Sequence, residues 1–346
     1  MNKLQVAVAR FLSCPPALRQ APPDLSTLDP QGWLALNAYL TERNLALAAY
    51  EHWIMDKAAD PAPAVRTDLR KSYIAASACV QWMQKELIRL LKAFATAHIE
   101  VVVLKGLHLG TLLWSDPALR PFGDIDLWVQ PEAIPSADAL LRQMGYQGGP
   151  ENLAAPLDWR YHELPNYNLA NHQLPFGAVD LHYRLAPQYL AAVNEKEIFA
   201  RAIPWWAGSH VLAPEDLIVY ITGHVARHLF VETRPALLYH VGYRYLGELA
   251  RLICASQVDW SRVAQQFAES EHRRALILPL RMIRSLWGIA FPQAITQLWQ
   301  TDLLGEAILK IMLTRFDHPW QARENQAFSF WNYALPDHIH RFGRKL

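Results

Sequence analysis

Two aspartates, Asp124 and Asp126, stand two residues apart within an apolar run that reads Gly-Asp-Ile-Asp-Leu-Trp-Val. Side chains at positions i and i+2 of a β-strand point to the same face, so we expect both carboxylates to project together. No lysine or arginine stands between them, and two close carboxylates are costly unless a cation offsets their charge. Such oxygen donors suit Mg²⁺ or Mn²⁺, which commonly take further ligands from water and phosphate. The pair therefore predicts a site for a divalent cation and a phosphorylated ligand.

A third carboxylate, Asp180, lies in a second apolar segment, Val-Asp-Leu-His. If it faces the pair, it completes a two-metal site and can also accept the proton of an attacking hydroxyl. An ion pair with Arg184 is the structural alternative for Asp180. His182 lies two residues further along the same strand, so its side chain is expected on the same face as Asp180. There it either orients a ligand, reaches the metal or packs as a core histidine.

Lys105 and Gly106 follow a β-branched run, Ile99–Leu104, which predicts a buried strand. A helical pattern runs from Gly106 to Trp114. Glycine lets the backbone approach a ligand, and a helix N-terminus favours an anion. We therefore expect Lys105 and Gly106 to contact phosphate, with an ordinary strand-end lysine as the alternative.

Arg120 lies in the turn-rich segment Pro117–Gly123, four residues before the first aspartate. An arginine at this place can hold phosphate oxygens bidentately and offset charge on a leaving pyrophosphate. We expect it to bind the nucleotide. A structural salt bridge to Asp116 or Asp124 is the alternative.

Together these segments resemble the uncharacterised nucleotidyltransferase family of the DNA polymerase β-like superfamily. The resemblance rests on Lys-Gly, a short helix, Asp-Pro-x-x-Arg-Pro-x-x-Asp-x-Asp and a later Val-Asp-Leu-His. It continues into His224–His228 and Glu248–Leu252, and covers roughly residues 30–295. Lys-Gly stands where the superfamily usually has Gly-Gly or Gly-Ser. The resemblance implies Asp124 and Asp126 as metal ligands and Asp180 as the third acid.

The resemblance also implies an activity: Mg²⁺-dependent transfer of a nucleoside monophosphate from an NTP to a hydroxyl of a small molecule, sugar or peptide. A kinase-like transfer of the γ-phosphoryl group at the same site is one alternative. A non-catalytic protein that binds a nucleotide or peptide is another. These residues select neither the base of the NTP nor the acceptor.

The elements that must position these residues change in kind along the chain. Residues 1–95 are helical in pattern, 96–186 predict a small α/β core, and 187–346 are helical again. We expect an α+β fold, in which a minimal nucleotidyltransferase core of mixed β-sheet and helices lies between helical regions that complete the substrate cleft. The expected strands are Ile99–Leu104, Ile125–Val129, Tyr161–Leu169 and Ala178–Tyr183, the last two joined by the loop Ala170–Gly177 as an antiparallel pair.

The expected helices show apolar residues at helical spacing. They are Thr67–Ala95, Pro131–Met144, Leu217–Leu229, Leu237–Ala255, Trp260–Ser270, Arg273–Ile289 and Asp302–Thr314. No element is assigned to the tail after Asp317.

Composition narrows the class of protein. Hydrophobic residues make up 52% and charged residues 19% of the 346 residues, which predicts a globular protein with a sizeable core. The net charge of +1 provides no basic field, so we expect no nucleic-acid partner.

Three distant cysteines argue for a reducing compartment. No apolar run reaches the ~18 residues of a membrane helix, and Arg10 interrupts the N-terminal apolar run. We expect a cytoplasmic protein without a membrane partner.

Other histidines and tryptophans have open roles. His224 and His228 have the i, i+4 spacing of zinc ligands, but no glutamate stands between them, so they face the cleft or pack. His108, on the helix after Lys105, is equally open. Three tryptophans either stack on a base or sugar or belong to the core: Trp159, Trp205 and Trp206.

Overall fold

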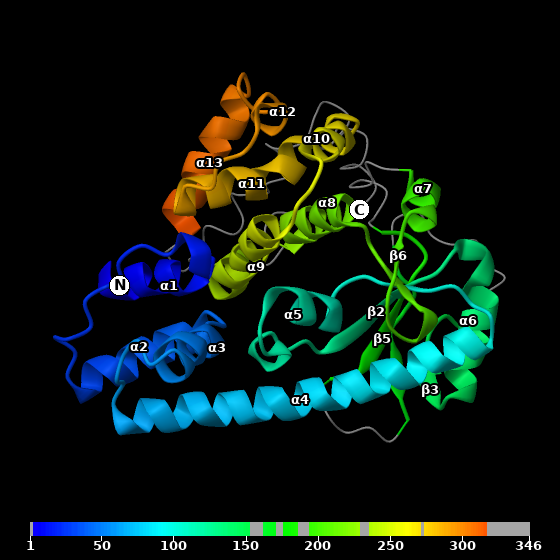
Figure 1. The fold of residues 1–346 in the computed structure, drawn as a ribbon, viewed down its shortest axis with the longest axis horizontal. Coiled ribbons are helices and arrows are strands. Elements are labelled where there is room, and N and C mark those ends of the chain that lie inside the picture. The colour runs from blue at the N-terminus through cyan, green and yellow to red at the C-terminus, as the bar shows by residue number, and fades with distance from the viewer. Residues whose placement is uncertain are drawn as a thin grey trace. The chain divides into compact units, whose positions relative to one another are not determined.

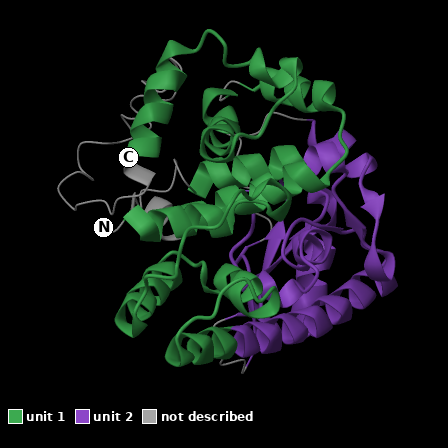
Figure 2. Cartoon of the chain, turned by 60° about the vertical axis from the view of Figure 1, so that its left-hand side comes forward, with its two compact units in different colours: residues 1–72, 218–346 green, residues 73–217 purple. Residues whose placement is uncertain are grey.

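The computed structural model describes residues 3–152, 162–170, 176–185, 194–228, 235–270 and 273–316. It divides into two compact units, coloured separately in Figure 2. Unit 1 comprises residues 1–72 and 218–346, and unit 2 comprises residues 73–217. The expected division into three parts, residues 1–95, 96–186 and 187–346, differs from these two units and stays a prediction.

Within the described residues, seven strands of unit 2 form one mixed sheet in the order β3-β4-β5-β2-β1-β7-β6 (Figure 1). Strand β2 runs parallel to β5 and antiparallel to β1, while β4 is antiparallel to both β3 and β5. The expected α+β class and the expected antiparallel pair are thereby confirmed. The strands are β1 (Val102–Val103), β2 (Asp124–Trp128), β3 (Tyr146–Gly148), β4 (Tyr167–Leu169), β5 (Ala178–His182), β6 (Ile203–Pro204) and β7 (His210–Val211).

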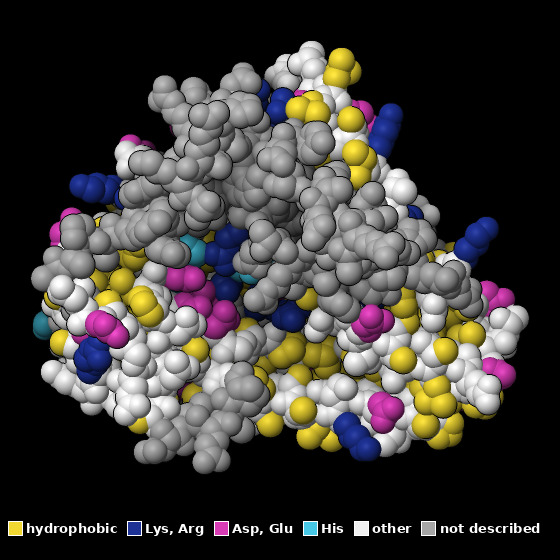
Figure 3. Space-filling view, turned by 180° about the vertical axis from the view of Figure 1, so that it is seen from behind, with side chains coloured by type: hydrophobic (Ala, Val, Ile, Leu, Met, Phe, Trp, Pro, Cys, Tyr) yellow, Lys and Arg dark blue, Asp and Glu magenta, His cyan; other side chains and the backbone are white. Residues whose placement is uncertain are grey.

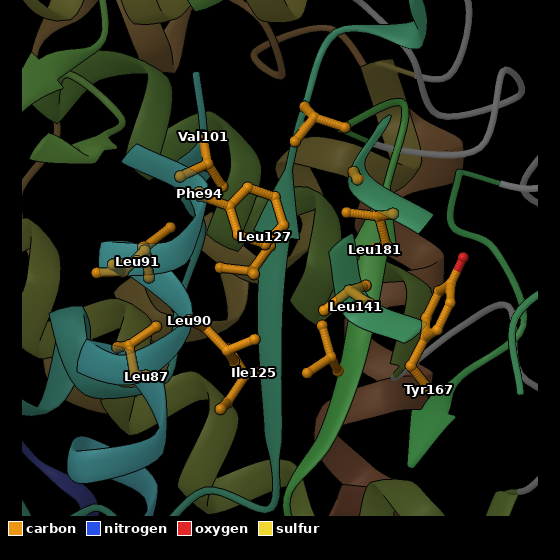
Figure 4. Packing of buried hydrophobic residues seen from close by; sticks show 14 of the residues in the cluster. Leu87, Leu90, Leu91, Phe94, Val101, Ile125, Leu127, Leu141, Tyr167 and Leu181 are labelled. Carbon is orange, nitrogen blue, oxygen red and sulfur yellow. The ribbon is translucent and has the colours of Figure 1, made fainter. Parts of the chain in front are cut away.

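One face of the sheet packs on two helices, α4 (Pro63–Thr96) and α6 (Ile134–Gln143). Because side chains alternate along a strand, Ile125 and Leu127 of β2 both reach this apolar layer. They meet the leucines of α4 and Phe94 in Figure 4. Each fully buried leucine here contributes about 2 kcal/mol of transfer free energy. The same alternation sends the aspartates of β2 to the opposite face.

The remaining elements of unit 2 connect these layers. They are α5 (Leu107–Leu113), η3 (Pro117–Leu119), η4 (Pro131–Ala133), α7 (Glu195–Ala200) and η6 (Trp206–Gly208). The helix expected at Gly106–Trp114 is confirmed as α5. The expectation that the chain is helical from residue 187 is wrong at β6 and β7, which extend the sheet beyond β1. Strand β3, which was not among the expected strands, follows directly after α6 and pairs with β4.

Unit 1 is helical. In it, α9 approaches α1 at Gly247, where a Cβ atom would lie only 2.6 Å from the Ser13 carbonyl oxygen, so a larger residue would force the helices apart. The Trp287 indole donates to the Arg10 carbonyl oxygen at 3.0 Å. The elements that lie in this unit or run into it are α1 (Lys3–Ser13), η1 (Pro16–Leu18), α2 (Pro30–Glu42), α3 (Ala46–Ala49), the π-helical turn η2 (Tyr50–Met55), α8 (Pro214–Ala226), α9 (Pro235–Ala255), α10 (Trp260–Ala268), α11 (Arg273–Trp287), α12 (Gln293–Thr296) and α13 (Leu303–Phe316).

In the part of the chain that the structure describes, every helix is too short or too polar to cross a bilayer. Several expectations lie outside that part: the start of a strand at Tyr161, the middle of the loop Ala170–Gly177, the role of Trp159 and the tail after Asp317.

Candidate functional site: a carboxylate cluster on two parallel strands

The three predicted aspartates lie together on the face of the sheet opposite α4. Strands β2 and β5 pair in a register that sets Asp126 directly beside Asp180, and Asp124 lies two residues before Asp126 on the same face. One carboxylate oxygen from each residue falls within 4.8 Å of the others. The Asp126 side chain is 2% exposed and that of Asp124 is 39% exposed, so the cluster runs from the interior to the surface.

Lys105 adds a positive charge that the spacing of the aspartates did not show. Its Nζ lies 3.3 Å from Asp124 Oδ2 and 3.1 Å from Asp126 Oδ1. The position follows from topology: β1 is antiparallel to β2, so the residues after β1 lie beside the start of β2. Lysine and the two aspartates thus form an ion-paired group, although no basic residue stands between the aspartates in the sequence.

The electrostatics of the cluster leave room for a further cation. Burial alone would raise the pKa of Asp126, but the Lys105 ammonium and the His182 ring together hold that pKa well below its usual range. Burial, then the charges of Asp126 and Asp124, raise the pKa of Asp180 to about 7. Asp126 Oδ2 is buried and has no hydrogen-bond partner among the described residues. An unpartnered buried carboxylate oxygen beside two further carboxylates fits the donor set of Mg²⁺ or Mn²⁺.

Two side chains hold the carboxylates in place. The Asn166 amide donates to Asp180 Oδ1 at 2.7 Å, and this contact takes the place of the considered ion pair with Arg184. His182 Nε2 lies 3.1 Å from Asp126 Oδ1, and the His182 side chain is 2% exposed. His182 therefore orients the innermost carboxylate instead of reaching solvent.

Gly106 and Arg120 shape the loop that carries Lys105. Gly106 has φ of 61° and ψ of −119°, a conformation that favours glycine, and an added Cβ atom would lie 3.1 Å from the Phe122 ring. Arg120 is 8% exposed and donates from Nη1 to the Gly106 carbonyl oxygen at 3.1 Å. This contact supports the backbone of the loop. The phosphate contacts expected of Gly106 and Arg120 stay predictions.

Aromatic side chains lie near the start of α5. Burial and the charge of Arg120 lower the pKa of His108 to about 4, so this ring is neutral at physiological pH. His108 makes an edge contact with Trp205, with ring centroids 5.7 Å apart. Trp205 in turn stacks on Trp206 at 4.5 Å and 5°, and Trp206 is 37% exposed. The stacking role of these tryptophans toward a ligand stays a prediction.

The second predicted pair, His224 and His228, lies in unit 1. The two rings are 4.3 Å apart and pack on Tyr245 at 5.8 and 5.2 Å. Among the described residues, both groups of three possible metal-ligating side chains lie in unit 2, and neither contains these histidines.

Three residues of the site were not singled out from the sequence: His162, Glu163 and Asn166. Glu163 pairs with His182 as an isolated antiparallel bridge, and Asn166 lies just before β4. The signal that could have found them is the expected antiparallel pairing of their segment with the strand of Asp180. Figure 3 shows a group of acidic side chains on one face of the molecule.

One comparison with known proteins gives a match to a protein family. A family model described as an uncharacterised nucleotidyltransferase matches residues 29–288, which is 260 of the 346 residues. The match contains all three aspartates and every side chain that holds them. No curated protein matches the chain significantly.

Proposed function

The chain belongs to the uncharacterised nucleotidyltransferase family, and on that premise we propose that it moves a nucleoside monophosphate from an NTP to an acceptor hydroxyl. One observation carries the proposal: neighbouring parallel strands bring three carboxylates together, and Asp126 presents a buried oxygen without a partner among the described residues. The acceptor is a small molecule, sugar or peptide, and the reaction takes place in the cytoplasm.

In this proposal Asp124, Asp126 and Asp180 hold Mg²⁺ or Mn²⁺. The bound cation would neutralise charge on the phosphates and on the oxygens that attack and leave. The three residues come from two rigid, paired strands, so little reorganisation is needed when the nucleotide binds.

Lys105 acts as a counterion that changes partner. Without a divalent cation, its ammonium lies between Asp124 and Asp126. When a cation neutralises these carboxylates, the ammonium would turn from them toward the phosphates of the nucleotide. The loop of Gly106, supported by Arg120, sets the starting position of the lysine.

Asp180 acts on the acceptor. It lies beside Asp126 across the two strands, and the Asn166 amide fixes one of its oxygens. The other oxygen is available to accept the proton of the attacking hydroxyl. His182 positions Asp126 through the 3.1 Å contact and takes no part in the proton transfer.

The test is to follow both ends of the nucleotide. The full chain is incubated with Mg²⁺, acceptor extracts and NTP labelled at either the α or the γ phosphorus. We expect the α label in an acceptor product and the γ label in pyrophosphate, with both lost in Asp126→Asn. Transfer of the γ label alone would contradict the proposal in favour of a kinase-like reaction, and equal labelling by Asp126→Asn would contradict the assignment of the site.

A further inference from the structure

A second cluster of possible metal ligands lies at the end of β5, next to the carboxylates. The segment that begins at His162 runs antiparallel to β5, with Glu163 opposite His182. Backbone bonds fix this alignment: Leu164 N donates to the Leu181 carbonyl oxygen at 2.9 Å, and Tyr183 N donates to the His162 carbonyl oxygen at 3.0 Å. The backbone thus brings two imidazoles and one carboxylate together.

We propose that His162, Glu163 and His182 form a second cation site, which takes a transition-metal ion such as Zn²⁺. Glu163 Oε2 lies 3.4 Å from His162 Nε2 and 3.5 Å from His182 Nε2. Tetrahedral Zn²⁺ with bonds of about 2.05 Å keeps neighbouring ligand atoms about 3.3 Å apart. The two observed distances match that spacing, and one ligand atom from each of the three residues falls within 4.8 Å of the others.

Burial and donor type separate this site from the carboxylate cluster. The two histidine side chains are 10% and 2% exposed, and that of Glu163 is 33% exposed, so an ion can enter past the glutamate. Imidazole nitrogens suit Zn²⁺ and its neighbours in the transition series, whereas carboxylate oxygens suit Mg²⁺. The proposal therefore does not depend on nucleotidyl transfer, and it predicts two adjacent sites with different preferences.

Hydrogen bonding does not satisfy every acceptor around His182. His182 Nε2 faces Asp126 Oδ1 at 3.1 Å and Glu163 Oε2 at 3.5 Å, although a ring nitrogen has only one proton to donate. A metal ion on Nε2 would take the lone pair of that nitrogen, so the ring proton would have to lie on Nδ1, and the ion would replace the hydrogen bond to Asp126. This Nδ1 is buried and has no partner among the described residues, which costs affinity. We therefore expect micromolar binding, weaker than that of a structural zinc site.

The test uses Co²⁺ as a spectroscopic substitute for Zn²⁺ on the metal-free full chain, without nucleotide. Tetrahedral Co²⁺ absorbs visible light much more strongly than octahedral Co²⁺. We expect the strong tetrahedral bands, displacement by Zn²⁺ and no displacement by excess Mg²⁺. Loss of one ligand in Glu163→Gln or His162→Gln should weaken binding at least about tenfold.

Asp124→Asn is the matched control, because Asp124 belongs to the carboxylate cluster alone. The Co²⁺ affinity of this variant should stay within about twofold of that of the wild type. Circular dichroism checks that each variant is folded, and the partly exposed Glu163 provides a second ligand variant if His162→Gln unfolds. Weak octahedral bands would overturn the proposal. Unchanged affinity in folded Glu163→Gln, or loss of binding in Asp124→Asn alone, would also overturn it.

Discussion

Two residue pairs in this chain have spacings that suit metal ligands, but the fold treats them differently. Asp124 and Asp126 lie on a strand whose parallel neighbour adds a third carboxylate within 4.8 Å. His224 lies in the last turn of α8 and His228 two residues beyond its end, and their rings pack on each other and on Tyr245. Strand pairing supplies new polar groups at a fixed register, whereas helical spacing by itself supplies only the pair.

The comparison also shows what a site needs beyond spacing. At the carboxylate cluster, a buried oxygen of Asp126 has no hydrogen-bond partner among the described residues, while Lys105 offsets only part of the negative charge. Such an arrangement is costly in the metal-free protein and becomes favourable when a cation binds.

The largest effect should come from Asp126. Replacing it with asparagine removes the innermost charge while keeping the shape, so we expect transfer activity to fall at least about 1,000-fold, or about 4 kcal/mol of transition-state stabilisation. The labelled-nucleotide assay measures this loss. His224→Gln is the matched comparison and should change the rate less than about threefold. A similar loss in both variants would erase the distinction between the two regions.

Lys105 should have the next largest effect. Lys105→Met removes the charge that the carboxylates face, so we expect activity to fall on the order of 100-fold. The melting temperature of the metal-free protein should fall as well, because the carboxylates then lack a counterion. Mg²⁺ should raise the melting temperature of this variant more than that of the wild type. Lys105→Arg keeps the charge, and a loss of metal-free stability as large as that of Lys105→Met would contradict the role of charge.

The raised pKa of Asp180 should make the stability of the protein depend on pH. Its folded pKa of about 7 lies above the usual value of 3.8, so the folded protein binds more protons than the unfolded chain between these values. The stability contribution of Asp180 is therefore complete below about pH 4 and is lost as pH rises through 7. In EDTA at pH 8, the free energy of unfolding of Asp180→Asn should exceed that of the wild type by about 2 kcal/mol. This is roughly half of the value expected if Asp180 titrated independently of the neighbouring carboxylates. Urea unfolding at pH 4 and 8 measures it, and equal differences at both pH values would refute the assignment.

The lowered pKa of His108 should have a smaller effect of the opposite sign on the pH dependence of stability. Its folded pKa of about 4 lies below the usual 6.5, so its contribution to stability is present above pH 6.5 and is lost as pH falls through 4. The free energy of unfolding falls between pH 7 and pH 4, and this fall should be about 1–2 kcal/mol smaller in His108→Phe than in the wild type. Unfolding of both proteins across this range is the measurement. Parallel pH profiles would show that burial of His108 does not set the acid sensitivity of unit 2.

The sequence predicted the parts of the fold that carry a period. The alternation around Asp124 and Asp126 located β2, and helical spacing located α4, α5 and α9. Strands β6 and β7 have two residues each, too few to show an alternation, and their pairing with β1 depends on a distant segment. For the same reason the expected antiparallel pairing alone did not set Glu163 opposite His182, because that contact depends on the register of the two segments.

The candidate site follows the same division. Spacing alone indicated two carboxylates on one face, and the apolar segment around Asp180 suggested the third, which the resemblance also implied. The Lys105 ammonium between them and the Asn166 amide on Asp180 arise from the order of strands in the sheet. Side chains brought together by topology leave no periodic signal in a single sequence.

If the three carboxylates hold a divalent cation together with an NTP, then nucleotide binding measured by calorimetry depends on both the metal and the aspartates. Each of ATP, CTP, GTP and UTP is titrated into the wild type, with Mg²⁺ and with EDTA, and into an Asp124→Ala/Asp126→Ala double variant whose fold is checked by circular dichroism. We predict that at least one nucleotide binds the wild type only with Mg²⁺ and does not bind the folded double variant. Equal binding by both proteins, or no binding of any nucleotide by the wild type, would contradict the claim.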